Sequence, residues 1–265
     1  MYSQMSCKTD VSNTKIQKQI KKLNNYFLKQ KEKVAYAYKN LKTNDIISFN
    51  IDTCFYSAST IKLLVCLYLY EQAIYDKNIL KHKINVTEKD YKQGSGVIKY
   101  KLDKFEYSIK ELIYYTLKYS DNTAYIKLME YVTPKAIKEY GTSLKAEHTL
   151  EGKDLFGITN ASDMICYLER IYQFISSDTE DANDIKNIML DPEYQIIQSK
   201  NIDHLPFIRK YGSFNIAYHE VGIVLDESPY ILIILTQKNK LNSKKRFLNI
   251  AAKKINKINK LIKNE

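Results

Sequence analysis

The first residues that could carry chemistry are a serine and a lysine three positions apart, Ser59 and Lys62. They begin a strongly apolar stretch, reaching to about Tyr75, that favours a buried helix. Because positions i and i+3 share a helix face, the Lys62 amine can lie within hydrogen-bond reach of the Ser59 hydroxyl. A buried lysine has a lowered pKa, and its neutral amine can accept the proton of a nucleophilic serine. Alone, the pattern also describes a helix-capping serine followed by a solvent-facing lysine.

Two further polar motifs follow along the chain. Ser120-Asp121-Asn122 precedes an apolar helical segment, and Lys210-Tyr211-Gly212-Ser213 lies on a predicted strand. Separately, each fits a helix cap or a strand that ends in a turn, but neither alternative accounts for all three motifs in this order. The free backbone NH at the helix start, on Ser59, is one half of an oxyanion site.

Together the three motifs resemble the Ser-x-x-Lys, Ser-Asp-Asn and Lys-Thr-Gly set of class A β-lactamases and penicillin-binding proteins. The resemblance extends over nearly the whole chain and implies a function for each motif. Ser59 would be the nucleophile, Lys62 would be its base, and Ser120 would relay a proton to the leaving nitrogen. The implied substrate-binding residues are Asn122 for an amide side chain, Lys210 for a carboxylate, Tyr211, Gly212, and Ser213, whose NH completes the oxyanion hole. The resemblance also implies that Asn122 bonds to Lys62.

The sequence departs from this family pattern in the residue that would free the acyl-enzyme. Class A β-lactamases carry a Glu-x-x-Leu-Asn motif there, and Glu147-His148-Thr149-Leu150-Glu151 is the one candidate. Glu147 is therefore the predicted catalytic base, although Glu151 stands where the motif has Asn. Tyr211 replaces a small hydroxyl residue and could crowd the carboxylate site. Cys66 has no partner cysteine near Ile113, so we expect a reduced, buried thiol.

The predicted function is a serine hydrolase that opens β-lactam amides through an acyl-enzyme on Ser59. Three alternatives stay open: a penicillin-binding D-alanyl-D-alanine peptidase, another amidohydrolase with slow deacylation, and a non-catalytic β-lactam-binding or wall-associated module. The expected partner is a small-molecule β-lactam or a peptidoglycan peptide. We expect no cofactor and no metal, because the four histidines are too scattered along the chain to suggest a ligand set.

The elements that position these residues predict an α+β fold. A helix from Ser12 to about Gln30 precedes two strands, at 34–38 and 45–51, and the middle of the chain is mainly helical. Three strands follow, at 207–210, 215–224 and 230–236, and a last helix begins at about Ser243. This order predicts an antiparallel five-stranded sheet flanked by the terminal helices, with an all-helical lobe. The chain would form a single domain, 1–265, with an α/β lobe from about 10–55 and 205–265 and a helical lobe over about 56–204.

The charge of the chain is strongly positive, with 41 Lys and Arg against 30 Asp and Glu and a net charge of +11. Basic residues concentrate in the terminal segments 15–33 and 238–263, mainly between apolar positions. This distribution argues against a nucleic-acid site and favours solvated helix faces, with contact to an anionic cell surface as the alternative. The resemblance suggests an extracellular or cell-surface monomer, while the opening residues lack the apolar stretch of a secretory signal and also fit a cytoplasmic protein.

Overall fold

An antiparallel sheet forms the centre of the protein, whose computed structural model describes residues 7–8, 14–198, 202, 204–215, 217–237 and 241–264. The strand order is β1-β3-β2-β10-β9-β8. Its strands are β1 (Cys7–Lys8), β2 (Val34–Asn40), β3 (Ile46–Phe49), β8 (Phe207–Phe214), β9 (Ala217–Val224) and β10 (Tyr230–Thr236). The five strands predicted from the sequence are present, and the two-residue β1, which was not predicted, adds a sixth at one edge. The predicted fold class is confirmed.

The central strand β10 is apolar from Tyr230 to Leu235 because both faces of the sheet are covered. Tyr230, Leu232 and Ile234 point into the cluster beneath the terminal helices. Ile231, Ile233 and Leu235 point into the cluster shared with the helical lobe. An unbroken apolar run, here the six residues from Tyr230 to Leu235, is what a strand buried on both faces requires.

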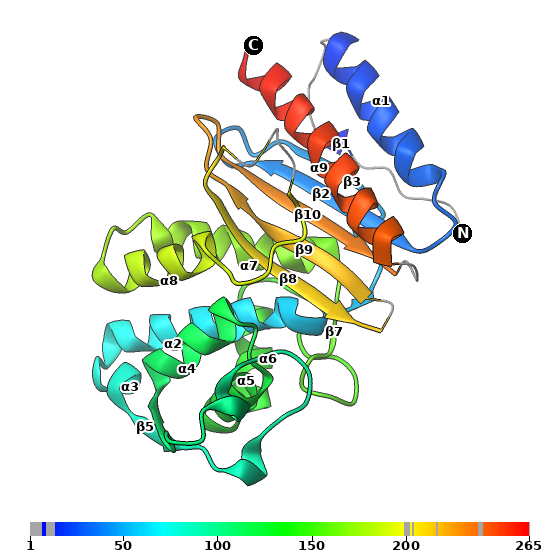
Figure 1. Ribbon diagram of the computed structural model, residues 1–265. Helices are drawn as coiled ribbons and strands as arrows, with labels where there is room; N and C mark the ends of the chain where they lie inside the picture. Colours follow the sequence, from blue (N-terminus) through cyan, green and yellow to red (C-terminus); the bar gives the residue numbers. More distant parts are fainter. Residues whose placement is uncertain are drawn as a thin grey trace.

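Two long helices, α1 (Thr14–Leu28) and α9 (Leu241–Lys263), lie side by side on one face of the sheet (Figure 1). The predicted first residues of the N-terminal helix, Ser12 and Asn13, lie outside the described residues. Tyr26 stacks on Phe247 with ring centroids 5.5 Å apart, which joins the two helices directly. None of the described helices has the length and the apolar run needed to cross a membrane.

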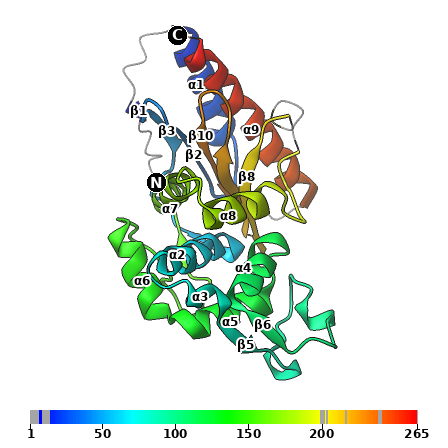
Figure 2. The same cartoon turned by 90° about the vertical axis from the view of Figure 1, so that its left-hand side faces the viewer.

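The other face of the sheet carries the helical lobe, with α7 and α8 next to the strands and α2 beyond them (Figure 2). Its helices are α2 (Lys62–Tyr75), α3 (Asn78–Lys81), α4 (Ile109–Lys118), α5 (Asn122–Val132), α6 (Pro134–Ser143), α7 (Ala161–Ile175) and α8 (Glu180–Leu190). Two small ribbons complete it: β4 (Phe55–Tyr56) pairs with β7 (Ile158–Thr159), and β5 (Lys83–Asn85) pairs with β6 (Glu106–Ser108). These ribbons and α3 were not predicted.

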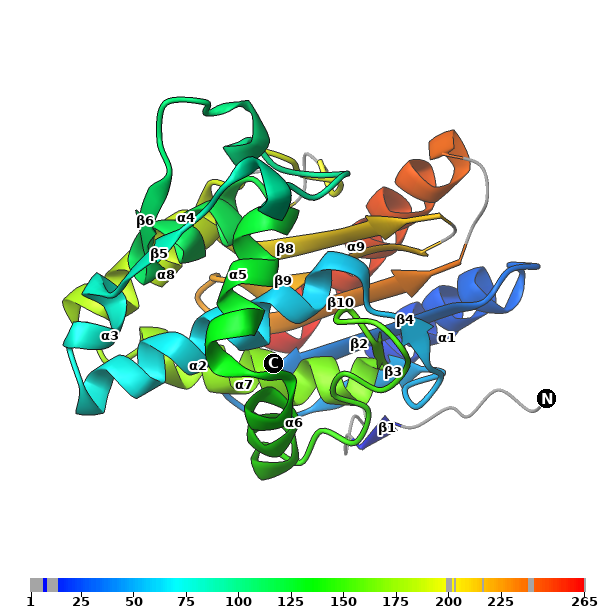
Figure 3. The same cartoon turned by 90° about the horizontal axis from the view of Figure 1, so that it is seen from below.

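The segment predicted as one helix from Ser59 to Tyr75 is divided in the structure. Residues Ala58–Ile61 form a 3₁₀ turn, η1, and the α-helix α2 starts only at Lys62. Ten residues of α2 are buried, so tertiary packing around its whole circumference fixes this helix. Seen from below, α2 leads from the lobe toward the sheet, which places η1 at their junction (Figure 3).

Candidate active site

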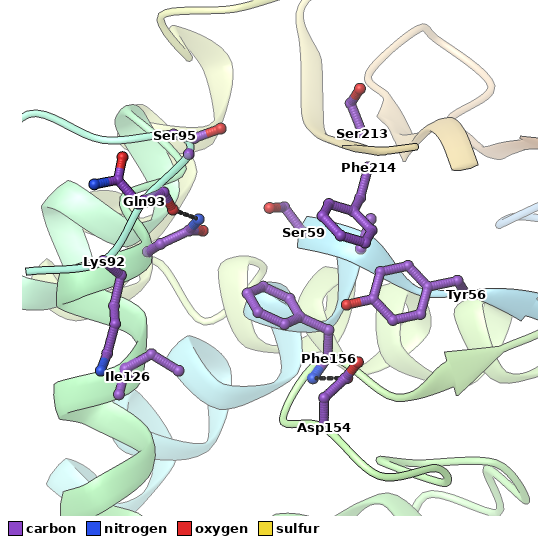
Figure 4. A pocket seen from close by; sticks show the side chains of 13 residues that line it. Tyr56, Ser59, Lys92, Gln93, Ser95, Ile126, Asp154, Phe156, Ser213 and Phe214 are labelled. Carbon is purple, nitrogen blue, oxygen red and sulfur yellow. Dashed lines mark hydrogen bonds between the residues drawn. The ribbon is translucent and has the colours of Figure 1, made fainter. Parts of the chain in front are cut away.

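Ser59 lies in η1, at the wall of a cavity of about 480 Å³. Its side chain points into this cavity (Figure 4) and is 7% exposed. The preceding residue, Ala58, has φ of 47°, a left-handed conformation that is rare for alanine and that tertiary contacts must hold. One such contact is the Ser57 NH, which donates to the Gly157 carbonyl at 3.0 Å. The turn before the serine is thus strained and fixed.

Strand β8 packs directly against η1 at Gly212. A Cβ on this residue would lie 3.0 Å from the Ser57 carbonyl oxygen and 3.0 Å from Thr60 Cγ2, which is tighter than ordinary van der Waals contact. Glycine therefore allows the strand to approach the nucleophile turn. As a result Ser213, the next residue on the strand, lines the same cavity as Ser59.

The Lys62 amine is completely buried beneath the cavity and joins the first two motifs. Its Nζ donates to the Ser120 carbonyl at 2.6 Å and to Asn122 Oδ1 at 2.8 Å, and lies 3.4 Å from Ser120 Oγ. Burial and the positive charge of Lys210 hold its pKa well below the usual lysine range. Within the described residues, the amine makes no hydrogen bond to Ser59, so the contact predicted from the sequence is not formed in this structure.

Lys210 is also buried, and desolvation lowers its pKa to about 7. Its Nζ donates to the Tyr211 carbonyl at 3.2 Å and lies 4.3 Å from the centre of the Tyr211 ring. That ring also contacts Tyr194, with centroids 4.9 Å apart. Neither Lys210 nor Tyr211 is among the residues that line the cavity. Tyr211 therefore covers the lysine, whereas the sequence suggested crowding of the carboxylate site.

Asp121 and Asn122 fix the loop that forms the opposite wall. Asp121 Oδ2 accepts hydrogen bonds from the NH groups of Val97 and Ile98 at 2.6 and 2.9 Å, and Asn122 Nδ2 donates to the Gln93 carbonyl at 2.8 Å. Gly96, with φ of 124°, lies so close that a Cβ there would meet the Asp121 carboxylate at 2.3 Å. The Ser120-Asp121-Asn122 motif thus binds the Lys62 amine and also holds the loop that forms this wall of the cavity.

Aromatic side chains line the cavity around Ser59, on the side opposite the loop that carries Gln93 and Ser95 (Figure 4). Tyr56 lies 5.4 Å from Phe214 and 6.4 Å from Phe156, measured between ring centroids. The Phe156 ring also lies 5.6 Å from Lys62 Nζ. An apolar ring of this wall therefore lies beside the buried amine.

A buried histidine supports the wall from behind. The Thr236 NH donates to His219 Nδ1 at 3.1 Å, so Nε2 carries the hydrogen and donates to the Tyr56 carbonyl at 2.9 Å. Burial lowers the pKa of His219 to about 4, which keeps the ring neutral. This pair of hydrogen bonds ties β9 and β10 to the strand that leads into η1.

Glu147 does not line the cavity. It is exposed, and its backbone NH donates to Asp163 Oδ1 at 2.8 Å, at the start of α7. The structure therefore does not bring Glu147, the catalytic base predicted from the sequence, to the cavity lining. The one carboxylate among the cavity-lining residues is Asp154, whose Oδ1 accepts hydrogen bonds from the NH groups of Phe156 and Gly157, both at 2.9 Å.

The structure thus brings eight of the nine predicted residues to one region. Ser59, Asn122 and Ser213 line the cavity, Lys62 and Ser120 lie beneath it, and Lys210, Tyr211 and Gly212 are on the adjoining strand. Glu147 is the exception. Sequence reasoning missed the aromatic wall, Asp154 and the residues of the 92–95 loop, since no motif marks them.

Comparison with known proteins identifies the family and the fold. The β-lactamase enzyme family matches residues 15–264, whereas no curated protein sequence matches the chain. The structure of PBP-A superimposes with a TM-score of 0.80 at 16% identity, over 92% of this chain and 95% of that chain.

Two β-lactamases show the same fold. The enzyme from Sphaerobacter thermophilus gives a TM-score of 0.75 at 16% identity, over 92% of this chain and 94% of that chain. The extended-spectrum β-lactamase TLA-1 gives 0.80 at 15% identity, over 92% of this chain and 98% of that chain. With its three motifs assembled around one cavity, the chain belongs to the β-lactamase enzyme family.

Proposed function

We propose that this protein is a serine acyl-transfer enzyme that reacts with β-lactams, or with peptidoglycan peptides of similar shape, through Ser59 and releases the acyl group slowly. The observation that carries the proposal is the buried Lys62 amine, which belongs to the first residue of α2, three positions after Ser59, and is bonded to Ser120 and Asn122. Burial and the Lys210 charge lower the pKa of Lys62, which favours its neutral amine, the form that can act as a base.

Acylation would begin when the Lys62 amine takes the proton of Ser59 as Oγ attacks the lactam carbonyl. The NH groups of Ser59 and Ser213 would stabilise the oxyanion. Ser120, whose Oγ lies 3.4 Å from the amine, would pass a proton to the departing ring nitrogen. The product is an ester between the opened lactam and Ser59.

Slow release is inferred from the surroundings of the same amine. Hydrolysis of the ester needs a base that activates water, and Glu147 lies outside the cavity lining. The rings of Tyr125 and Phe156 lie 5.5 and 5.6 Å from Lys62 Nζ, which favours exclusion of water. One similar structure, at a TM-score of 0.79 and 14% identity, over 92% of this chain and 96% of that chain, is an acyl-enzyme complex of a PBP-A mutant with penicillin G.

Intact-protein mass spectrometry with benzylpenicillin tests the proposal. We expect one covalent adduct that maps to Ser59 and persists after free penicillin is removed. Ser59→Ala should abolish the adduct, whereas Ser143→Ala, an exposed serine at the end of α6, should retain it. The absence of an adduct with any β-lactam, in protein shown to be folded, would overturn the proposal.

The role of Phe156 is tested by a pair of variants. Phe156→Glu places a carboxylate beside Lys62 and should shorten the lifetime of the adduct about 100-fold, the range of general-base catalysis. Phe156→Leu keeps an apolar side chain and should leave the lifetime within a few-fold of the wild-type value. An equally long lifetime in Phe156→Glu would argue that water access does not limit release.

A second function, β-lactam hydrolysis with turnover, is favoured by one observation. Asp154 supplies a carboxylate to the cavity wall, beside Phe156. If the wild-type protein hydrolyses a chromogenic cephalosporin rapidly, and Asp154→Asn accumulates the acyl-enzyme, hydrolysis is the function and Asp154 takes the part that was predicted for Glu147.

A further inference from the structure

The positive charge of this protein is concentrated on its two terminal helices. Helices α1 and α9 carry twelve Lys and Arg and no Asp or Glu. The rest of the chain holds twenty-nine basic and thirty acidic residues and is close to neutral. The net charge of +11 is therefore a property of one layer, which we call the basic layer, and the rest of the molecule contributes almost none of it.

Most cations of the basic layer face solvent and are unpaired. Seven of them are exposed and form no ion pair with another described residue: Lys18, Lys21, Lys22, Arg246, Lys253, Lys257 and Lys260. By contrast, Lys263 pairs with Asp226 and Glu227, and Lys244 is buried over the Tyr218 ring. An array of like charges without counter-charges is destabilising for the free protein, so an anionic surface would relieve it.

The shape of the layer decides what kind of anion fits. The two helices lie side by side over the sheet (Figures 1 and 2), and α9, with 23 residues, is about 34 Å long. Their apolar faces are buried against the sheet, and among the described side chains of the two helices Leu28, at the end of α1, is the one large apolar group that is exposed, which is too little to anchor the layer in lipid tails. The one aromatic residue that borders the outer face, Tyr26, is half-buried and stacked on Phe247. Base stacking on single-stranded nucleic acid therefore has no platform among the described residues of the basic layer.

From these observations we propose that the basic layer docks electrostatically on the headgroups of an anionic phospholipid bilayer. A plane can contact cations on both helices at once, whereas a linear polyanion would follow a single row. The substrate cavity lies on the lobe side of the sheet, opposite the basic layer, and stays open in the docked protein. This inference is independent of the function proposed for Ser59.

Vesicle co-sedimentation at low and at physiological salt tests the docking. The probes are vesicles of phosphatidylglycerol and phosphatidylcholine in equal amounts and vesicles of phosphatidylcholine alone. We expect binding only to the anionic vesicles, weakening with salt. Removing four cations from the layer, with Lys18, Lys22, Lys253 and Lys257 changed to Gln, should weaken binding several hundredfold, since each cation near an anionic surface contributes about fivefold.

A matched variant distinguishes the effect of charges in the basic layer from the effect of the net charge of the protein. Lys81, Lys89, Lys138 and Lys145 are exposed lysines of the helical lobe, and changing them to Gln removes the same total charge. This variant should bind within a few-fold of the wild type. Equal loss in both variants would overturn the proposal, and so would retention of binding in the layer variant. If soluble polyphosphate bound as tightly as the vesicles, the proposal of a bilayer would be overturned, and the ligand of the basic layer would be a linear polyanion.

Discussion

Replacement of Lys210 by methionine tests the buried pair of lysines beneath the cavity. The folded pKa of Lys210 is about 7 against an ordinary value of 10.5, because burial disfavours the charged form. Between these two pH values the folded state binds fewer protons than the unfolded state, so the free energy of unfolding rises with pH. Each pH unit within the window contributes up to about 1.4 kcal/mol.

The magnitude follows from the same two pKa values. At pH 7 the lowered pKa of Lys210 reduces the free energy of unfolding by about 4 kcal/mol. Between pH 7 and pH 9 this reduction becomes smaller by about 2 kcal/mol. Lys210→Met keeps the length and the apolar stem but has no proton to lose. Its unfolding free energy should therefore rise about 2 kcal/mol less than that of the wild type over this range. Lys62, whose pKa is lowered by burial and by the Lys210 charge, contributes a rise of the same sign in both proteins, and this rise is no larger in the variant because the Lys210 charge is absent there.

Urea denaturation followed by far-ultraviolet circular dichroism at several pH values between 7 and 9 measures this difference. Lys253→Met, on the exposed face of α9, is the control, and its profile should parallel the wild type because that side chain remains in water. If Lys210→Met and the wild type also gave parallel profiles, Lys210 would not lose its proton in this range, and the reasoning about the buried pair would be refuted.

Three further outcomes are expected from the same geometry. Lys62→Met should slow acylation of Ser59 by labelled penicillin about 10²- to 10⁴-fold while the protein stays folded, because the proton acceptor is gone; a rate within a few-fold of wild type would assign the base elsewhere. The folded pKa of His219 is about 4 and lies below the unfolded value, so the free energy of unfolding of the wild type falls by up to about 3 kcal/mol as the pH falls from 6.5 to 4. In His219→Gln this fall should be smaller, and urea denaturation measures it. Gly212→Ala should push β8 away from η1 and lower the acylation rate even under conditions where the variant stays folded. An unchanged rate would show that this contact is dispensable.

The candidate site was predictable to the extent that its residues form local patterns. Ser59 and Lys62 are one turn apart on any helix, and the order of the three motifs carries the family resemblance. Tertiary packing decided how the amine is used. It is bonded to Ser120 and Asn122, which are far away in the sequence, and no local spacing could indicate that its hydrogen bonds would go there in place of Ser59.

Glu147 shows where pattern reasoning fails. A glutamate three residues before a leucine matches part of a motif, but the direction of a loop side chain depends on what the loop packs against. Here Asp163 holds the backbone of Glu147 at the start of α7, and the chain then continues to Asp154 and Phe156, which reach the cavity. Contacts between distant segments determine where such a loop side chain lies, and these contacts leave no periodic pattern in the sequence.

The sequence by itself determined the elements and the chemistry of the nucleophile, because helix and strand periods and the three motifs are local properties of the chain. It also located the excess of positive charge in the two terminal helices. Only the tertiary structure placed these helices side by side on one face, lined the cavity with Tyr56, Phe156 and Phe214, and buried Lys210 beneath Tyr211. The physical reason is that burial, pKa and water access depend on neighbours brought together by folding, and the order of residues along the chain does not encode those distances locally.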